Sequence, residues 1–121
     1  MTKKITIAID AMGGDNSPDK TIGGVKIFFD KNKVNKDFHF KLFGDEKKIK
    51  AKLSNLNIPS DFVSVIHTES VVSDEETPLT AVKNSKNTSM WNSIQSQVNG
   101  QSDISLSAGN TGVMLVISRM I

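Results

Sequence analysis

Two glycine-rich segments carry short polar side chains in a pattern that suits an anion. The first is Asp10-Ala-Met-Gly-Gly-Asp15, and the second is Ser107-Ala-Gly-Asn-Thr-Gly112. Each follows a stretch that predicts a β-strand, and the second runs directly into an apolar stretch that predicts a helix. Free N–H groups at a helix start, with the positive end of the helix dipole, attract phosphate or a developing oxyanion. The same residues also suit a sharp strand-to-helix turn that uses glycine and asparagine for geometry alone.

The candidate phosphate- or substrate-binding residues are the glycines and short polar side chains of these two segments and of one helix start. They are Asp10, Gly13, Gly14, Asp15, Lys86, Ser89, Ser107, Gly109, Asn110, Thr111 and Gly112. His67 ends a predicted strand and is a candidate acid–base group, with a structural hydrogen-bonding role as the alternative. Asp10 and Asp15 are open to two interpretations, as acid–base groups or as turn formers. No catalytic residue is assigned from the sequence.

Several familiar chemistries are excluded or weakly supported. Residues 14–21 approach the P-loop pattern, but Asp19 replaces its second glycine and Pro18 removes a backbone donor. The spacing Gly109-x-x-Gly112 lacks the first glycine of the dinucleotide fingerprint. The chain has no cysteine, which excludes a disulfide framework, a zinc–thiolate site and thiol catalysis.

The basic residues are concentrated in the first part of the chain. Residues 1–52 hold twelve lysines against seven acidic residues, whereas residues 53–121 hold three basic residues against six acidic ones. Nucleic-acid-binding surfaces usually combine arginine with stacking aromatics, and this chain has one arginine and few aromatics. We therefore expect no nucleic-acid partner, and either a solvated lysine-rich face or an acidic protein partner.

Strand and helix patterns alternate along the chain. This order predicts one α/β domain, a parallel sheet with helices on both faces. The predicted strands span residues 4–10, 38–43, 62–67 and 104–106, and the predicted helices span residues 18–31, 45–56, 79–83, 89–98 and 113–121. In such sheets ligands bind beyond the carboxyl ends of the strands, where both glycine-rich segments fall.

The last predicted helix is apolar almost all round and has no stop signal before Ile121. We therefore expect a truncated chain, or a second polypeptide that covers this helix. The longest uninterrupted aliphatic run, Val113–Ile117, is far shorter than a membrane span, so a soluble cytoplasmic protein is the default expectation.

Motifs along essentially the whole chain resemble the bacterial phosphate acyltransferase family PlsX. The matching segments are Ile7–Asp15, Leu42–Glu46, Val65–Thr68, Asp74–Pro78, Ser89-Met90 and Ser107–Gly112. The resemblance implies a fold similar to the isocitrate/isopropylmalate dehydrogenase-like group. It also implies transfer of a fatty acyl group from acyl carrier protein to inorganic phosphate, which gives acyl phosphate for phospholipid synthesis.

The same resemblance implies the setting of the enzyme. Family members are cytoplasmic, associate peripherally with the membrane, form homodimers and need no metal or organic cofactor. Residues 1–121 would form the N-terminal α/β portion of a larger enzyme, inactive alone, and the basic face at residues 26–52 would meet the carrier protein. The alternatives are an inactive anion-binding fragment or relic, and a relative that uses a short acyl-CoA.

Overall fold

In the part of the chain that the structure describes, four parallel strands form the central sheet. The computed structural model describes residues 4–31, 37–73, 75, 77 and 86–121. The strands are β1 (Ile5–Asp10), β2 (Phe38–Gly44), β3 (Val63–His67) and β4 (Ile104–Ser107), in the order β3-β2-β1-β4. All their pairings are parallel, which confirms the predicted sheet. β3 begins one residue later than expected, because Phe62 belongs to a short 3₁₀ helix, η1 (Ser60–Phe62).

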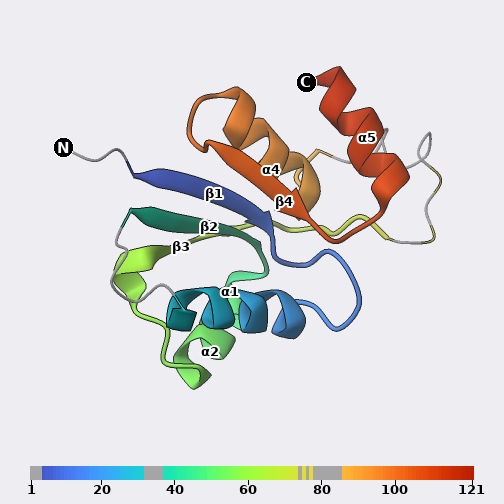
Figure 1. Ribbon diagram of the computed structural model, residues 1–121. Helices are drawn as coiled ribbons and strands as arrows, with labels where there is room; N and C mark the ends of the chain where they lie inside the picture. Colours follow the sequence, from blue (N-terminus) through green and yellow to red (C-terminus); the bar gives the residue numbers. More distant parts are fainter. Residues whose placement is uncertain (1–3, 32–36, 74, 76, 78–85) are drawn as a thin grey trace.

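Helices cover both faces of this sheet, as the alternating pattern predicts (Figure 1). One face carries α1 (Asp19–Lys31) and α2 (Glu46–Asn55), and the other carries α4 (Ser89–Val98), against which α5 (Thr111–Met120) packs. The helix expected at residues 79–83 lies outside the described residues. None of the described helices is both long and apolar enough to cross a membrane.

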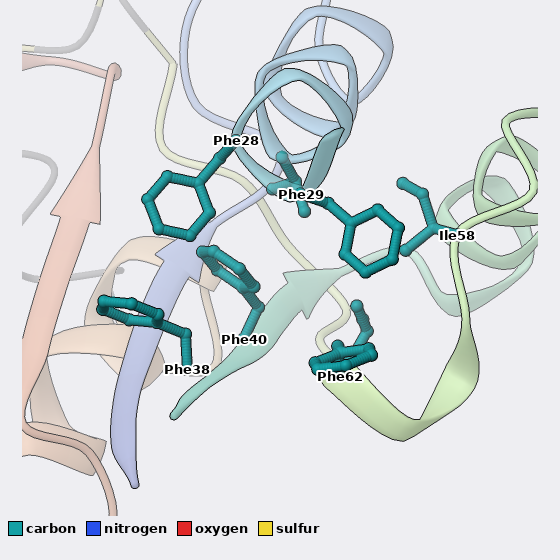
Figure 2. A pocket seen from close by; sticks show the side chains of 8 residues that line it. Phe28, Phe29, Phe38, Phe40, Ile58 and Phe62 are labelled. Carbon is teal, nitrogen blue, oxygen red and sulfur yellow. The ribbon is translucent and has the colours of Figure 1, made fainter. Parts of the chain in front are cut away.

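Phenylalanine side chains join α1 to the sheet. Figure 2 shows Phe28 of α1 directed at two rings of β2, Phe38 and Phe40. The ring centroids lie 5.2 and 5.5 Å away and the rings meet edge to face, an arrangement that aromatic pairs prefer. Phe29 packs toward Phe62 with the ring centroids 5.3 Å apart and the rings tilted by 59°. The cluster leaves a void of only about 10 Å³, so this end of α1 is fixed against β2.

A second apolar core lies on the opposite face. It joins α4 and α5 through the buried residues Val72, Met90, Trp91, Ile94, Val113 and Ile117. The expected start of the last helix at Val113 is wrong by two residues. The helix begins at Thr111 because the Asn110 side chain caps it, accepting a hydrogen bond from the Val113 N–H at 3.2 Å. Leu115 on the same helix is 64% exposed.

Gly23 lies within α1, and a Cβ added there would meet nothing within 4 Å. Glycine within a helix costs about 0.5–1 kcal/mol relative to alanine through backbone entropy. Gly23→Ala is therefore expected to raise the free energy of unfolding by about that amount. Urea unfolding followed by circular dichroism measures the change, and an unchanged or lower midpoint would contradict this account of α1.

Candidate functional site

A hydrogen bond joins the two glycine-rich loops. Asp10 and Ser107 end neighbouring strands and are register partners across β1 and β4. The Ser107 hydroxyl donates to Asp10 Oδ2 at 2.8 Å and accepts from the Gly109 N–H at 3.1 Å. The Met12 N–H donates to the other carboxylate oxygen, Asp10 Oδ1, at 3.2 Å. Asp10 is only 2% exposed, and its buried carboxylate is hydrogen-bonded to both loops.

The glycines let the loops touch. A Cβ on Gly13 would lie 2.6 Å from Asp10 Oδ2 and 2.9 Å from the Gly109 nitrogen, closer than any side chain tolerates. Gly14 has a φ of +87°, in the region that favours glycine, and lies against Ala108 of the second loop. The expectation that both segments lie beyond the carboxyl ends of the strands is therefore confirmed, and the structure adds that they touch. At Gly13 and Gly14 geometry alone demands glycine.

The start of α5 presents backbone donors beside the joined loops. Asn110 Oδ1 takes the Val113 N–H, and Asn110 Nδ2 donates to the Ser73 carbonyl oxygen at 3.2 Å. Within the described part of the chain, the N–H groups of Thr111 and Gly112 have no hydrogen-bond partner. They stand at the positive end of the α5 dipole, an arrangement that binds anions.

Three polar residues at the start of α1 complete the rim of the site. The Ser17 hydroxyl donates to the Gly13 carbonyl oxygen at 2.6 Å and lies 3.2 Å from the Thr21 hydroxyl. Ser17, Lys20 and Thr21 line a cavity of about 670 Å³ together with Asp10, Gly13, Gly14, Asp15 and Ser107. None of these three residues was among the site candidates predicted from the sequence. Their helical spacing directly after a glycine-rich loop is the signal that would have identified them.

Lys86 and Ser89 are not among the residues that line the cavity. Met90, next to Ser89, extends its Cε to 3.0 Å from where a Cβ of Gly109 would stand. Ser89 is fully buried, and its hydroxyl has no hydrogen-bond partner within the described residues. Lys86 is exposed in the turn before α4. Their contact with an anion stays a prediction.

His67 lies at the same edge of the sheet but far from the loops. β3 and β1 are separated by β2, which places the end of β3 about 10 Å from Asp10 at the usual strand spacing. The Glu46 N–H donates to His67 Nδ1 at 3.2 Å, and His67 Nε2 lies 3.0 Å from Glu69 Oε1. The imidazole thus supports the start of α2, and its acid–base role stays a prediction.

The other histidine, His39 of β2, forms a hydrogen bond to the neighbouring strand β3. Its Nε2 lies 2.7 Å from the Ser64 hydroxyl of β3, and burial, followed by the charge of Lys4, lowers the pKa of His39. Among the described residues, no group of three or more His, Asp or Glu side chains is placed to hold a metal ion.

Comparison with known proteins shows the family to which this chain belongs. The family model described as "Fatty acid synthesis protein" matches residues 5–121. The chain belongs to this fatty acid synthesis protein family. It is similar to the phosphate acyltransferases of Pelagibacter ubique (46% identical over 120 residues, 99% of this chain), Rhodospirillum rubrum (36% over 121 residues, 100%) and Streptococcus mutans (38% over 118 residues, 95%). The resemblance to phosphate acyltransferases inferred from the motifs is therefore confirmed.

These relatives of the family are longer proteins. The chain spans 34% of the Pelagibacter and Rhodospirillum proteins and 32% of the Streptococcus protein, about a third of each. Both glycine-rich loops of the site fall within the segment matched by the family model.

The coupling between Asp10 and Ser107 is measurable in a double-mutant cycle. Asp10→Asn leaves one acceptor where two donors converge, and Ser107→Ala removes one donor, so each change should destabilise the fold by about 1–3 kcal/mol. We expect the two losses to fall short of additivity by about 1 kcal/mol, measured by urea unfolding.

Ser105→Ala provides a matched control for this cycle. Ser105 lies on the same strand, but its hydroxyl donates to Gln97 Oε1 at 2.7 Å instead of to the carboxylate. Paired with Asp10→Asn, it should give additive losses. Equal coupling in both pairs would refute a specific link between the loops.

Proposed function

We propose that residues 1–121 are the N-terminal α/β portion of a phosphate acyltransferase that moves a fatty acyl group from acyl carrier protein to inorganic phosphate. The product would be an acyl phosphate for phospholipid synthesis. The observation that carries the proposal is the Ser107–Asp10 hydrogen bond, which sets both glycine-rich loops beside the open amides of α5. The names of the similar proteins support the same reaction.

The reaction needs two anionic groups held close together. An oxygen of inorganic phosphate attacks the thioester carbonyl carbon, the new C–O bond replaces the C–S bond, and the carrier's thiolate leaves and takes up a proton. The carbonyl oxygen gains negative charge during the attack, so preorganised N–H donors lower the barrier. The amides of Thr111 and Gly112 suit either anion, and Lys20 at the rim adds positive charge.

An acidic carrier protein would meet the lysines of α2. Lys47, Lys48 and Lys50 are exposed on this helix, whereas Ile49 between them is buried in the core. α2 starts directly after β2, at the edge of the sheet where β1 and β4 also end. Opposite charges there would steer the carrier toward the loops.

The proposal extends to the whole enzyme by family resemblance. It includes a fold of the isocitrate/isopropylmalate dehydrogenase-like group, a cytoplasmic location with peripheral membrane association, and a homodimer. Since the chain spans about a third of its relatives, activity is expected only when the remaining two-thirds are supplied.

A chimaera tests the reaction. This chain replaces the matching third of the Pelagibacter relative, to which it is 46% identical. With acyl carrier protein thioester and inorganic phosphate, we expect the chimaera to form acyl phosphate, trapped as hydroxamate, and the 121-residue chain alone to form none. A folded but inactive chimaera would favour the alternative of an inactive anion-binding fragment or relic. Activity with short acyl-CoA in place of the carrier thioester would favour a relative that uses a short acyl-CoA.

Asn110 variants of the chimaera test where phosphate binds. Asn110→Asp and Asn110→Ser both keep an oxygen that can cap α5, but only the aspartate adds negative charge at the loop. We expect Asn110→Asp to raise the KM for phosphate about tenfold or more, and Asn110→Ser to raise it much less. Equal KM values for the two variants would move the phosphate site away from this loop.

A further inference from the structure

The 670 Å³ cavity is a groove between α1 and the sheet, and its chemistry changes along its length. At the carboxyl end of the strands it is lined by the polar loops. Farther back, the described residues that line it are apolar and come from β1, β2, β4 and α1: Ile7, Ile9, Phe40, Leu106, Val25 and Phe28. A ligand that fits this lining has a polar head and a linear apolar tail.

On the side of α1 that faces the groove, a single row of residues also changes from polar to apolar. Lys20, Gly24 and Phe28 follow one another at intervals of four residues, so they share one side of the helix. All three line the groove, and the row runs from a cation through a position without a side chain to an aromatic ring. From Lys20 to Phe28 it extends about 12 Å at the rise of an α-helix.

The groove is closed at its far end and open along β4. The far end is closed by the phenylalanine cluster, where Phe28 and Phe40 pack edge to face (Figure 2). Along β4 the groove is open, and Leu106 is 50% exposed. An apolar tail lying there would cover this leucine, at a gain of about 25 cal/mol per Å² of apolar surface removed from water, or about fourfold in affinity for each buried methylene.

We propose that this groove binds the alkyl chain of a fatty acyl group, with the acyl carbonyl at the Asp10 and Ser107 loops and the tail running along α1 toward Phe28. This inference rests on the proposed function and names where its substrate's tail lies. The volume is within the 300–1,000 Å³ range of small-molecule sites. Gly24 is the residue that leaves room for the tail.

Two adjacent glycines of α1 allow a matched test. A Cβ at Gly23 or at Gly24 would meet nothing within 4 Å, so neither position is crowded where a side chain begins. Only Gly24 lines the groove. Gly24→Leu places its side chain in the path of the tail, whereas Gly23→Leu raises the helix propensity equally and leaves the groove open.

The probes are octyl and decyl phosphate below their micelle concentrations, with inorganic phosphate as the control, titrated calorimetrically into the chimaera. We expect decyl phosphate to bind about tenfold tighter than octyl phosphate or better, because two more methylenes are buried. Gly24→Leu should weaken decyl phosphate binding about tenfold or more relative to Gly23→Leu. Both variants should bind inorganic phosphate with equal affinity.

Equal decyl phosphate affinity in the two leucine variants would overturn the proposal. So would a chimaera that unfolds with Gly24→Leu but not with Gly23→Leu, since that result would mean polypeptide from the remaining two-thirds fills the groove. Failure of the proposed function is a separate result: a chimaera that forms no acyl phosphate but binds decyl phosphate in a Gly24-dependent manner refutes the reaction and retains the groove.

Discussion

The hydrogen bond from the Ser107 hydroxyl to the Asp10 carboxylate is the contact on which the candidate site depends. It connects the ends of β1 and β4, and the Gly109 N–H donates a hydrogen bond to the same hydroxyl. Because the carboxylate is buried, its oxygens need donors within the protein, and the loops supply them. The close contact of the two loops follows from satisfying this one group, whereas the start of α5 is set by the Asn110 cap.

The arrangement also explains why so much of the site consists of backbone. Glycines at the contact bring the two main chains together, and side chains that reach into the site are short. Backbone amides at a helix start are held by the helix itself, so they need no reorganisation when charge develops near them. The proposed anion would be recognised through the position of these amides and the helix dipole, and Lys20 adds a positive charge at the rim.

Much of this was readable from the sequence, for identifiable reasons. Alternating apolar residues placed β1 and β2. The helix predicted from residue 45 matches α2, where the Asp45 side chain caps the helix and accepts from two amides. The placement of both loops at one edge of the sheet followed from the rule that ligands bind beyond parallel strand ends, but their direct contact depends on β4 lying beside β1. The remoteness of His67 did not follow, because the strand order that puts β3 at the far side depends on tertiary packing. The α5 start and the Ser17–Thr21 rim were missed because caps and loop returns are decided by individual hydrogen bonds.

The central position of β1 has a consequence for the time at which the site can form. β1 pairs with β2, which follows it closely in the chain, with Ile5 opposite Phe38. Its other partner, β4, is much farther along the chain, since Asp10 and Ser107 are 97 residues apart. Such a closure is entropically costly and slow relative to local pairing. During synthesis, the Asp10 carboxylate therefore stays in water until β4 has left the ribosome. Sheet assembly can start with β1 and β2, whereas the two glycine-rich loops can meet only once β4 has been made.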